Sequence, residues 1–411
     1  MLQQYKKRMI AQRLREALNV APVVVLAGAR QTGKTTLLTH ELPFKDWPFF
    51  SLDDPELLTL AKVSPRDVVN AHDKMIIDEV QKAPELLSYV KMAVDKDRSR
   101  IFVLSGSANL LLMKNVSESL AGRAIYLELM PFSLHEYLER PGHHWIAMAG
   151  ERNFAEKLAG TEQCGEPLDS VLFRGLLPPA TFLDKESNIS LWWKGYIGTY
   201  LERDLRMLSQ VGDIASFHQF MEILAHRTGR ILKQSEAARD AGLSAASASR
   251  YVSLLETTGL YYRLRPFFAN LTKRLIKAPK GFFLDTGLAG ALAGFKTASS
   301  ITPEFGAQLL ETFVFHNLLG HVSHVGGKLC YFRTLGGKEI EVDFVIELDD
   351  GLVVLEVKYK KELTAKDVRP LIQFSDLTSG GKKILLKAII YTGGDIKALP
   401  GGVLAIPWFV L

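Results

Sequence analysis

The sequence predicts an α/β protein with a parallel-sheet domain first, a helical middle, and a smaller mixed α/β domain last. Short apolar runs alternate with helical stretches over residues 1–140, the pattern of a parallel sheet covered on both faces. Residues 141–216 form a linker and a helical segment, and helical rhythm continues through residues 217–270. In residues 271–411 one largely apolar helix precedes several strands. We take these four ranges as the domain boundaries.

Composition bounds the class of protein. The chain has 411 residues, 47% of them hydrophobic, which is too long for one ordinary core and indicates two to three domains. The net charge of +5 and a pI of about 8.9 are compatible with a nucleic-acid partner. Cys164 and Cys330 are the two cysteines, so neither a disulfide framework nor a cysteine metal site is indicated. With no secretory signal and no membrane-length apolar run, we expect a cytoplasmic protein that does not contact a membrane.

The first domain is organised around a glycine-rich turn. Apolar residues 23–27 run into Gly28-x-x-x-x-Gly33-Lys34-Thr35, the spacing of a P-loop, and helix formers follow. Glycines let backbone N–H groups surround a phosphate chain, and a helix N-terminus favours the same anion. Lys34 would contact the phosphates and Thr35 would bind Mg²⁺. A chance match on a surface turn is the alternative. The expected nucleotide-binding residues are Gly28, Ala29, Arg30, Gln31, Thr32, Gly33, Lys34, Thr35 and Thr36.

A second motif lies some fifty residues downstream. Residues 75–79 read as an apolar strand that ends in Asp78 and Glu79. In this setting Asp78 would hold Mg²⁺ through water, and Glu79 would polarise the attacking water. Two acidic residues at a helix N-terminus are the alternative interpretation.

Two further positions are catalytic candidates. Residues 101–107 read as a strand with a polar end, which places Ser107 between the acidic strand end and the γ-phosphate. Asn109 is the second choice, and a helix N-cap at either residue is an equal alternative. Arg123 precedes a strand at 124–129 and could reach a γ-phosphate in its own or a neighbouring subunit; a structural salt bridge is the alternative.

The remaining elements of this domain complete the sheet. Residues 6–18 predict a basic amphipathic helix whose cations Lys7, Arg8 and Arg15 we assign to a solvated face, with contact to nucleic acid as the alternative. Residues 49–53 predict another strand, and Asp54-Pro55-Glu56 opens a helix. In such a sheet the ligand sits at the carboxyl ends of the strands, where the predicted site residues project.

Several motifs together resemble a known family. Gly28 to Thr36, Ile77-Asp78-Glu79-Val80-Gln81, Ser105-Gly106-Ser107, Ala121-Gly122-Arg123 and Met130-Pro131-Phe132-Ser133 occur in this order. This order is similar to that of the prokaryotic AAA-type ATPases with an AAA-14-like N-terminal domain and a C-terminal domain of unknown function, DUF 4143. The resemblance covers nearly the whole chain. It implies an AAA-like domain that uses ATP and Mg²⁺.

Residues 217–270 have the element order of a winged helix-turn-helix. Helices at 220–227, 234–240 and 244–257 precede Tyr261 to Leu264 and Phe267-Phe268, which would form the wing hairpin. The same fold also serves as a protein–protein module. If the partner is DNA, the expected contacts are Arg250, Arg263, Arg265, Lys273, Arg274, Lys277 and Lys280.

The last domain carries the pattern of PD-(D/E)XK nucleases. Asp343 lies on one strand and Glu356-x-Lys358 on the next, where residues two apart share a face. Asp343, Glu356 and Glu311 from the preceding helix would bind Mg²⁺, and Lys358 would position the attacking water. The alternatives are a solvent-facing pair on an edge strand, or a domain that binds without cutting.

Three function classes follow. The first is an ATP-driven enzyme that acts on nucleic acid, with a possible nuclease in its C-terminal half. The second is an ATP-dependent switch that binds a protein partner. The third is an ATPase whose C-terminal domains are structural and oligomerising. In each class we expect a homo-oligomer.

Overall fold

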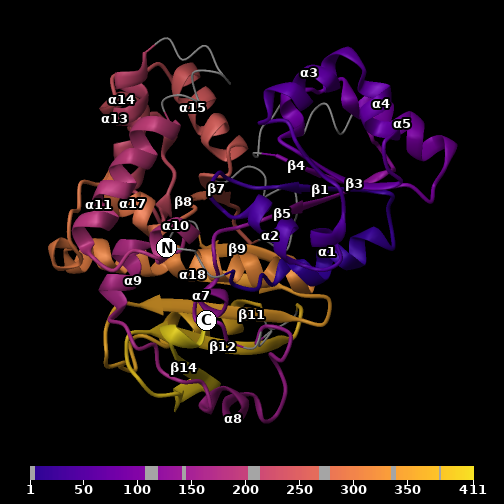
Figure 1. Cartoon of the computed structure of the whole chain (residues 1–411). Coiled ribbons are helices and arrows are strands. Elements are labelled where there is room, and N and C mark those ends of the chain that lie inside the picture. Colours follow the sequence, from indigo (N-terminus) through magenta and orange to yellow (C-terminus); the bar gives the residue numbers. More distant parts are fainter. Residues whose placement is uncertain are drawn as a thin grey trace. The chain divides into compact units, whose positions relative to one another are not determined.

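The computed structural model describes residues 5–106, 119–140, 145–201, 213–267, 278–334, 339–378 and 381–411. The chain forms two compact units (Figure 1). Unit 1 consists of Met1–Phe132 and two short segments, Leu177–Phe182 and Leu255–Leu260. Unit 2 consists of Ser133–Leu176, Leu183–Leu254 and Tyr261–Leu411. The glycine-rich turn therefore belongs to unit 1, and the predicted nuclease-like residues belong to unit 2.

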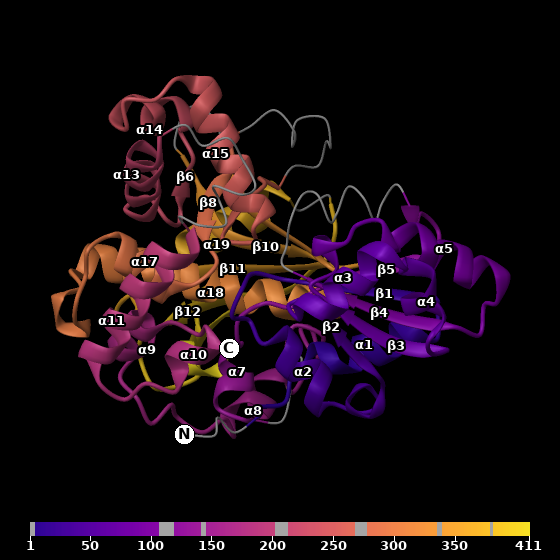
Figure 2. The ribbon, with the colours of Figure 1, turned by 45° about the horizontal axis from the view of Figure 1, so that its top comes forward.

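Unit 1 is built on a sheet of five parallel strands in the order β2-β3-β4-β1-β5 (Figure 2). The strands are β1 (Val23–Ala27), β2 (Phe49–Ser51), β3 (Lys74–Asp78), β4 (Ile101–Ser105) and β5 (Ala124–Glu128). All of β1 is buried, as expected for a strand that has a neighbour on each side and is covered on both faces. The parallel sheet that the sequence predicts is confirmed.

Helices cover both faces of this sheet. They are α1 (Ile10–Leu18), α2 (Lys34–His40), α3 (Pro55–Val63), α4 (Pro65–Asn70) and α5 (Leu86–Lys96). Alternate residues of β1 enter two different cores. Val23 and Val25 pack with Val90 of α5, whereas Val24 and Leu26 pack with Leu37 of α2. Because β1, β3 and β4 run parallel to one another, their carboxyl ends lie at the same edge of the sheet.

The first part of unit 2 is helical. It contains α7 (Leu134–Tyr137), α8 (Phe154–Ala159), α9 (Leu168–Arg174), α11 (Glu186–Gly195), a π-helical turn η3 (Tyr196–Leu201) and α17 (Thr286–Leu292), while α10 (Pro178–Thr181) belongs to unit 1. Asp285 joins two of these helices. Its carboxylate caps α17 by accepting from Gly287 N at 2.7 Å, and it also accepts from Leu176 N after α9, at 2.7 Å.

Three helices and a small antiparallel sheet, in the order β6-β8-β7, form the middle segment. These elements are α13 (Ile214–Ala225), β6 (Arg230–Ile231), α14 (Gln234–Asp240), α15 (Ala245–Thr257), β7 (Tyr261–Leu264) and β8 (Lys280–Phe283). The predicted pairing of Tyr261–Leu264 with Phe267-Phe268 is wrong. The partner of β7 is β8, and Phe267 N donates instead to Tyr331 O, because Phe267 packs into the C-terminal core; Phe268 lies outside the described residues. Strand β8, assigned from sequence to the last domain, thus completes the sheet of the middle segment.

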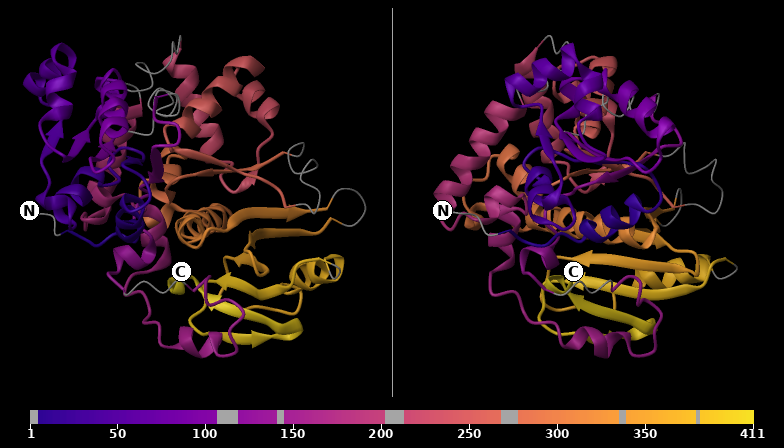
Figure 3. Two further views of the ribbon diagram at one scale, coloured as in Figure 1. Left: turned by 90° about the vertical axis from the view of Figure 1, so that its right-hand side faces the viewer. Right: turned by 45° about the vertical axis from the view of Figure 1, so that its right-hand side comes forward.

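The C-terminal part of unit 2 is a six-stranded mixed sheet in the order β13-β14-β12-β11-β10-β9, seen in orange and yellow in Figure 3. Strands β11, β12 and β14 are parallel to one another and the other pairs are antiparallel. The elements are α18 (Pro303–Val325), β9 (Lys328–Arg333), β10 (Glu341–Glu347), β11 (Leu352–Lys358), α19 (Arg369–Leu377), β12 (Ile384–Tyr391), β13 (Lys397–Leu399) and β14 (Val403–Pro407). The sequence predicts the mixed sheet and its first four strands but neither β13 nor β14. Single 3₁₀ turns occupy Phe44–Asp46, Val80–Lys82, Ala298–Ser300, Pro400–Gly402 and Trp408–Val410.

Helices α18 and α19 cover opposite faces of this sheet. Phe344 of β10 lies under α18, where its ring is 6.4 Å from that of Phe315. The next residue, Val345, belongs to the core that contains Phe374 of α19. Successive side chains of β10 therefore point to opposite faces of the sheet, and the strand packs against both helices. Among the described residues, no helix is long and apolar enough to cross a bilayer.

Candidate functional site

The glycine-rich turn joins β1 to α2 at the carboxyl edge of the unit 1 sheet. Gly33 is the N-cap of α2 and has φ 92°, a conformation that favours glycine. A Cβ placed on Gly28 would lie 2.4 Å from Leu129 O, so this position requires glycine for space. Within the turn Ala29 is buried, whereas Arg30 and Gln31 are exposed. The turn thus has the strand before it and the helix after it that phosphate binding requires.

Lys34 is buried inside the turn. Its Nζ donates to Gly28 O and to Ala29 O, each at 3.0 Å. Burial lowers the pKa of Lys34 to about 8, against the opposing charges of Glu79 and Asp78. A phosphate group would offer this amine a stronger, charged partner than the two carbonyls do.

Asp78, the last residue of β3, is held by two hydroxyls. Thr35 Oγ1 donates to Asp78 Oδ2 at 3.0 Å, and Ser105 Oγ donates to Asp78 Oδ1. Asp78 and Ser105 are 3% and 0% exposed, whereas Thr35 is an exposed residue. A hydroxyl and a carboxylate are hard oxygen ligands, so Thr35 and Asp78 fit a Mg²⁺ ion. Ser105 is a site residue that the sequence motifs did not single out; its position as the last residue of β4, beside β3, is the signal that indicates it.

Glu79 directly follows β3 and has a left-handed backbone, with φ 55°. A non-glycine residue in this region is uncommon and is found at functional turns. Burial raises the pKa of Glu79 and the charge of Asp78 raises it further, while Lys34 and a hydrogen bond from Gln81 lower it. A carboxylate whose pKa lies closer to neutral pH is suited to accept a proton from water.

Arg8 anchors the turn from outside. Its guanidinium donates to Thr32 O at 2.7 Å and to Met130 O at 2.6 Å, and it lies 4.7 Å from the centre of the Phe132 ring. Arg8 is 6% exposed. The assignment of Arg8 to a solvated face is therefore wrong, because the side chain is buried and its two terminal nitrogens donate to backbone carbonyls.

A small pocket adjoins the start of α2. It is open beside Gly33 and Thr36, which follow the phosphate-binding part of the turn. Three aromatic side chains and a proline form much of its wall. Its lining consists of Tyr5, Lys6, Arg8, Gly33, Thr36, Phe132, Pro178 and Phe182, all within unit 1.

The other two catalytic candidates of unit 1 have different outcomes. Ser107 and Asn109 lie outside the described residues. Arg123 precedes β5 at its amino end, whereas the glycine-rich turn follows the carboxyl end of the parallel strand β1. Arg123 therefore does not reach the phosphate position of its own subunit. Its guanidinium instead donates to Asp95 at 2.5 and 2.9 Å, and both side chains are partly exposed.

The predicted nuclease-like residues gather in unit 2. Lys358 Nζ donates to Glu356 Oε1 at 2.6 Å, as expected for residues two apart on β11. Asp343 Oδ2 on the neighbouring strand β10 accepts from Val357 N at 2.9 Å. The third predicted ligand, Glu311 of α18, contacts Lys280 Nζ at 2.8 Å. Across the described residues, no group of three or more His, Cys, Asp or Glu side chains is arranged to hold a metal ion.

The predicted DNA-contacting residues do not all face solvent. Arg250, Arg263 and Arg265 are exposed. Lys273, Arg274 and Lys277 lie outside the described residues. The prediction for Lys280 is wrong, since its side chain is 3% exposed and pairs with three carboxylates.

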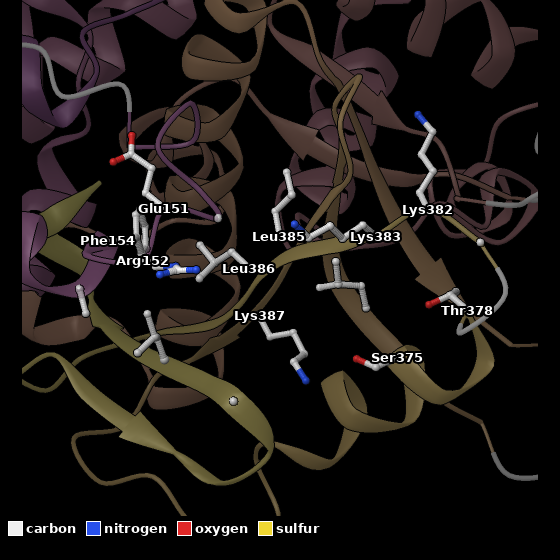
Figure 4. A pocket seen from close by; sticks show the side chains of 16 residues that line it. Glu151, Arg152, Phe154, Ser375, Thr378, Lys382, Lys383, Leu385, Leu386 and Lys387 are labelled. Carbon is white, nitrogen blue, oxygen red and sulfur yellow. The ribbon is translucent and has the colours of Figure 1, made fainter.

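A second concave surface lies in unit 2, between the start of β12 and the segment before α8 (Figure 4). We call it the β12 groove. Its charged lining residues are Glu151, Arg152, Lys382, Lys383 and Lys387, so cations outnumber acids among them. Figure 4 shows that Lys382 and Lys387 extend in different directions from β12 and the residues just before it. Lys387 Nζ contacts Gly401 O at 2.5 Å, and Lys382 lies 3.5 Å from Glu347.

Three family models match successive parts of the chain. The model described as an AAA domain matches residues 20–138, which include the glycine-rich turn and the end of β3. A domain of unknown function, DUF8612, matches residues 165–299. Another domain of unknown function, DUF4143, matches residues 306–411. The predicted AAA_14 and DUF4143 domains are thus confirmed.

Several relatives match most of the chain. The uncharacterized proteins Mb2031c of Mycobacterium bovis and Rv2008c of Mycobacterium tuberculosis are each 31% identical over 358 residues, covering 86% of this chain and 74% of theirs. An uncharacterized protein of Haemophilus influenzae is 22% identical over 406 residues, covering 92% of each chain. A solved structure, the Walker-type ATPase PABY2304 of Pyrococcus abyssi, is 17% identical, covers 70% of this chain and 96% of its own, and has a TM-score of 0.48. The chain therefore belongs to one family with the mycobacterial proteins, and it carries an AAA domain in its N-terminal part and a DUF4143 domain at its C-terminal end.

Proposed function

We propose that this chain binds ATP with Mg²⁺ and hydrolyses it at the carboxyl edge of the unit 1 sheet. The observation that carries the proposal is the 3.0 Å contact between Thr35 Oγ1 and Asp78 Oδ2. In P-loop enzymes a hydroxyl from the loop and an aspartate from a neighbouring strand hold the Mg²⁺ that bridges the β- and γ-phosphates. These two side chains come from distant parts of this sequence and meet beside the glycine-rich turn.

The phosphate chain would occupy the turn itself. Backbone N–H groups at the start of α2 point toward this position, and the helix dipole favours the negative charge. Lys34 Nζ would exchange its carbonyl partners, Gly28 O and Ala29 O, for phosphate oxygens. The remaining predicted binding residues of the turn, from Ala29 to Thr32 and Thr36, would supply backbone contacts.

Hydrolysis would depend on Glu79. Its position directly after Asp78 would bring its carboxylate next to the γ-phosphate, where it would orient the attacking water and take its proton. The burial of Glu79 and its raised pKa favour this proton transfer from water. Mg²⁺, when bound, would neutralise the charge that develops on the phosphate oxygens.

The adenine ring would enter the pocket next to Gly33 and Thr36. Tyr5, Phe132 and Phe182 give this pocket aromatic walls, which suit a flat ring. Gly33 and Thr36 belong both to the glycine-rich turn and to the lining of this pocket, so the pocket adjoins the proposed phosphate position. This assignment also gives the segment around α10 a role, because Pro178 is the first residue of that short helix and Phe182 directly follows it.

Two variants test the proposal. Lys34→Ala should lose nucleotide binding, because the phosphates lose their buried cation. Glu79→Gln should keep nucleotide binding and lose turnover by at least tenfold, because the group that polarises the water is absent. The matched controls are Lys62→Ala and Glu85→Gln, which change exposed residues of the same unit. Fluorescent-nucleotide binding and phosphate release measure the two properties. Full hydrolysis by Glu79→Gln would contradict its assignment.

A second candidate function is nucleic-acid binding by unit 2. The β12 groove favours it, because four of its five charged residues are cations. Arg250, Arg263 and Arg265 add exposed guanidinium groups on the middle segment, which we interpret as a winged helix. In this role ATP hydrolysis by unit 1 would be coupled to a bound polyanion.

The test is the rate of ATP hydrolysis with and without single- or double-stranded DNA. Stimulation that declines with rising salt would support a nucleic-acid partner, because phosphate contacts weaken as counterions compete. A rate of ATP hydrolysis that DNA does not change at low salt would favour the alternative, an ATP-dependent switch that acts on a protein partner.

A further inference from the structure

Lys280 is a charged residue in the protein interior. It is the first residue of β8, and its side chain is 3% exposed. Lysine is almost never buried to this extent unless its charge is paired. The groups around this ammonium must therefore pair with its charge.

All three ammonium protons of Lys280 have a carboxylate within reach. Nζ lies 2.8 Å from Glu311 Oε1, 2.8 Å from Glu341 Oε1 and 3.0 Å from Asp343 Oδ1. Burial lowers the pKa of Lys280, but these carboxylates outweigh it, and the pKa stays above its ordinary value. Lys280 is therefore protonated at neutral pH, and its ammonium lies at the junction of β8, α18 and β10.

The carboxylate cluster continues beyond the lysine. Asp343 faces Lys280 with one oxygen and accepts from Val357 N with the other, which brings β11 to the same place. Glu356 of β11 is 5% exposed, and its Oε2 has no hydrogen-bond partner among the described residues. Lys358 contacts its other oxygen. Two ammonium groups thus face four carboxylates, and one buried carboxylate oxygen has no donor.

A hard divalent cation is the ligand that such oxygens ordinarily take. Glu311, Asp343 and Glu356 are the three ligands that the sequence predicts for Mg²⁺. In the structure the point between Glu311 and Asp343 is filled by Lys280 Nζ. The described residues, as arranged here, offer no metal-holding group of three. A metal and this ammonium would compete for the same oxygens.

We propose that Lys280 is a built-in cation that takes the metal position of the C-terminal carboxylate cluster and keeps divalent metal out of it. In this arrangement the cluster joins the β6-β8-β7 sheet to α18 and β10 instead of doing metal chemistry. Stacking of Phe282 on Phe315, with ring centres 4.3 Å apart, fixes β8 next to α18 and so fixes the lysine in the cluster. The C-terminal domain is thereby closed to metal-dependent cleavage while β8 stays in place.

Binding of Mn²⁺ to the full-length protein tests this, with free Mn²⁺ followed by electron paramagnetic resonance. Asp78→Asn is included in every protein, so that the unit 1 site does not contribute. This reference protein should take up no Mn²⁺ in unit 2. Adding Lys280→Met, which keeps an unbranched side chain one atom shorter and removes the charge, should create a site for one Mn²⁺. Adding Glu356→Gln to that protein should weaken the new site at least tenfold.

The reference protein alone can overturn the proposal. Uptake of one Mn²⁺ that Asp343→Asn abolishes would show that Lys280 does not exclude metal. A folded Lys280→Met protein with no Mn²⁺ site would show that the lysine does not stand in a metal position. Lys280→Arg, which keeps the charge, is the matched control and should stay free of Mn²⁺.

Glu341→Gln carries the same test if Lys280→Met does not fold. Glu341 is 38% exposed and is not among the three predicted metal ligands, so its loss loosens the lysine and leaves those ligands in place. Mn²⁺ affinity should then rise at least tenfold over the reference. Unchanged affinity in this folded variant would overturn the proposal.

Discussion

Thr35 Oγ1 and Asp78 Oδ2 lie 3.0 Å apart although 43 positions separate the two residues in the sequence. The contact exists because β1 and β3 are parallel strands of one sheet and end at the same edge. The other Asp78 oxygen accepts from Ser105 Oγ of β4, the strand between them. One carboxylate is thus oriented from both sides before any metal arrives.

Ser105→Ala should weaken Mg²⁺ binding without abolishing it. Asp78 would lose the donor that orients its Oδ1, and outer hydrogen bonds of this kind typically change metal affinity by about 10–100-fold. The measurement is the Mg²⁺ concentration that gives half-maximal ATP hydrolysis. Ser88→Ala, an exposed serine of α5, is the matched control. An unchanged Mg²⁺ midpoint in Ser105→Ala would mean that Thr35 alone orients Asp78.

The affinity for ATP should fall above pH 8. The pKa of Lys34 is about 8 before nucleotide binds, because the amine is buried. Bound phosphates favour the charged form, so well below pH 8 the amine is already protonated and pH has no effect through this group. Above pH 8 binding must take up a proton, and affinity should drop by up to about tenfold per pH unit.

Calorimetry in two buffers of different ionisation enthalpy measures that proton directly. Nucleotide phosphates are already ionised at pH 8.5, so uptake there belongs to the protein. Lys34→Arg, whose guanidinium stays charged, should lose the pH dependence if it binds nucleotide. Equal affinity at pH 7 and 9 with no proton uptake would contradict the role of Lys34.

Arg123 should act on a neighbouring subunit if it acts on phosphate at all. It lies at the amino end of β5, away from the turn of its own chain, and its pair with Asp95 is partly exposed. An exposed ion pair of this kind costs little to exchange for a stronger anion. We predict a homo-oligomer in which Arg123→Ala has low activity and is rescued by mixing with Lys34→Ala, because each mixed interface can combine an intact arginine with an intact turn.

Specific activity should accordingly rise with protein concentration. Asp95→Ala is the control, since it breaks the same ion pair and leaves the arginine free to act. If Arg123→Ala has normal turnover at every concentration, the Asp95 pair is structural and nothing more.

Local signals predicted the parts of the fold that local physics decides. The spacing from Gly28 to Thr35 reports the turn because only glycine fits the close approach to Leu129 O and the left-handed N-cap. Asp78 was predictable because it ends an apolar run. The strands β13 and β14 were missed because they are short and flank Pro400-Gly401-Gly402; two successive glycines with positive φ were the available hairpin signal.

Two cations show why the rest was not predictable. Arg8 and Lys280 belong to basic stretches, and a basic stretch ordinarily lies on the surface. Arg8 is buried because its guanidinium donates to the carbonyls of Thr32 and Met130. Every residue has a backbone carbonyl, so the sequence does not indicate which ones will accept from an arginine. The carboxylates around Lys280 lie 31 or more positions away, so the burial of this lysine depends on how β8, α18 and β10 come together.

The β12 groove should contribute more to DNA binding than the exposed arginines of the middle segment. Arg152 and Lys383 are exposed and line one concave surface, so a phosphate backbone could approach both. The double variant Arg152→Glu/Lys383→Glu should lower DNA affinity similarly for all sequences and reduce the salt slope of binding by about one per lost phosphate contact.

Lys296→Glu/Lys366→Glu is the matched control, because it makes the same change in net charge at exposed positions outside the groove. Fluorescence anisotropy of labelled duplex DNA across a salt series measures both quantities. A loss of affinity with Arg263→Ala/Arg265→Ala but none with the groove variant would move the contact to the middle segment, as the sequence predicts. Equal losses in the groove variant and its control would mean that net charge alone attracts the DNA, because a specific path along the groove requires its own cations to matter more than others.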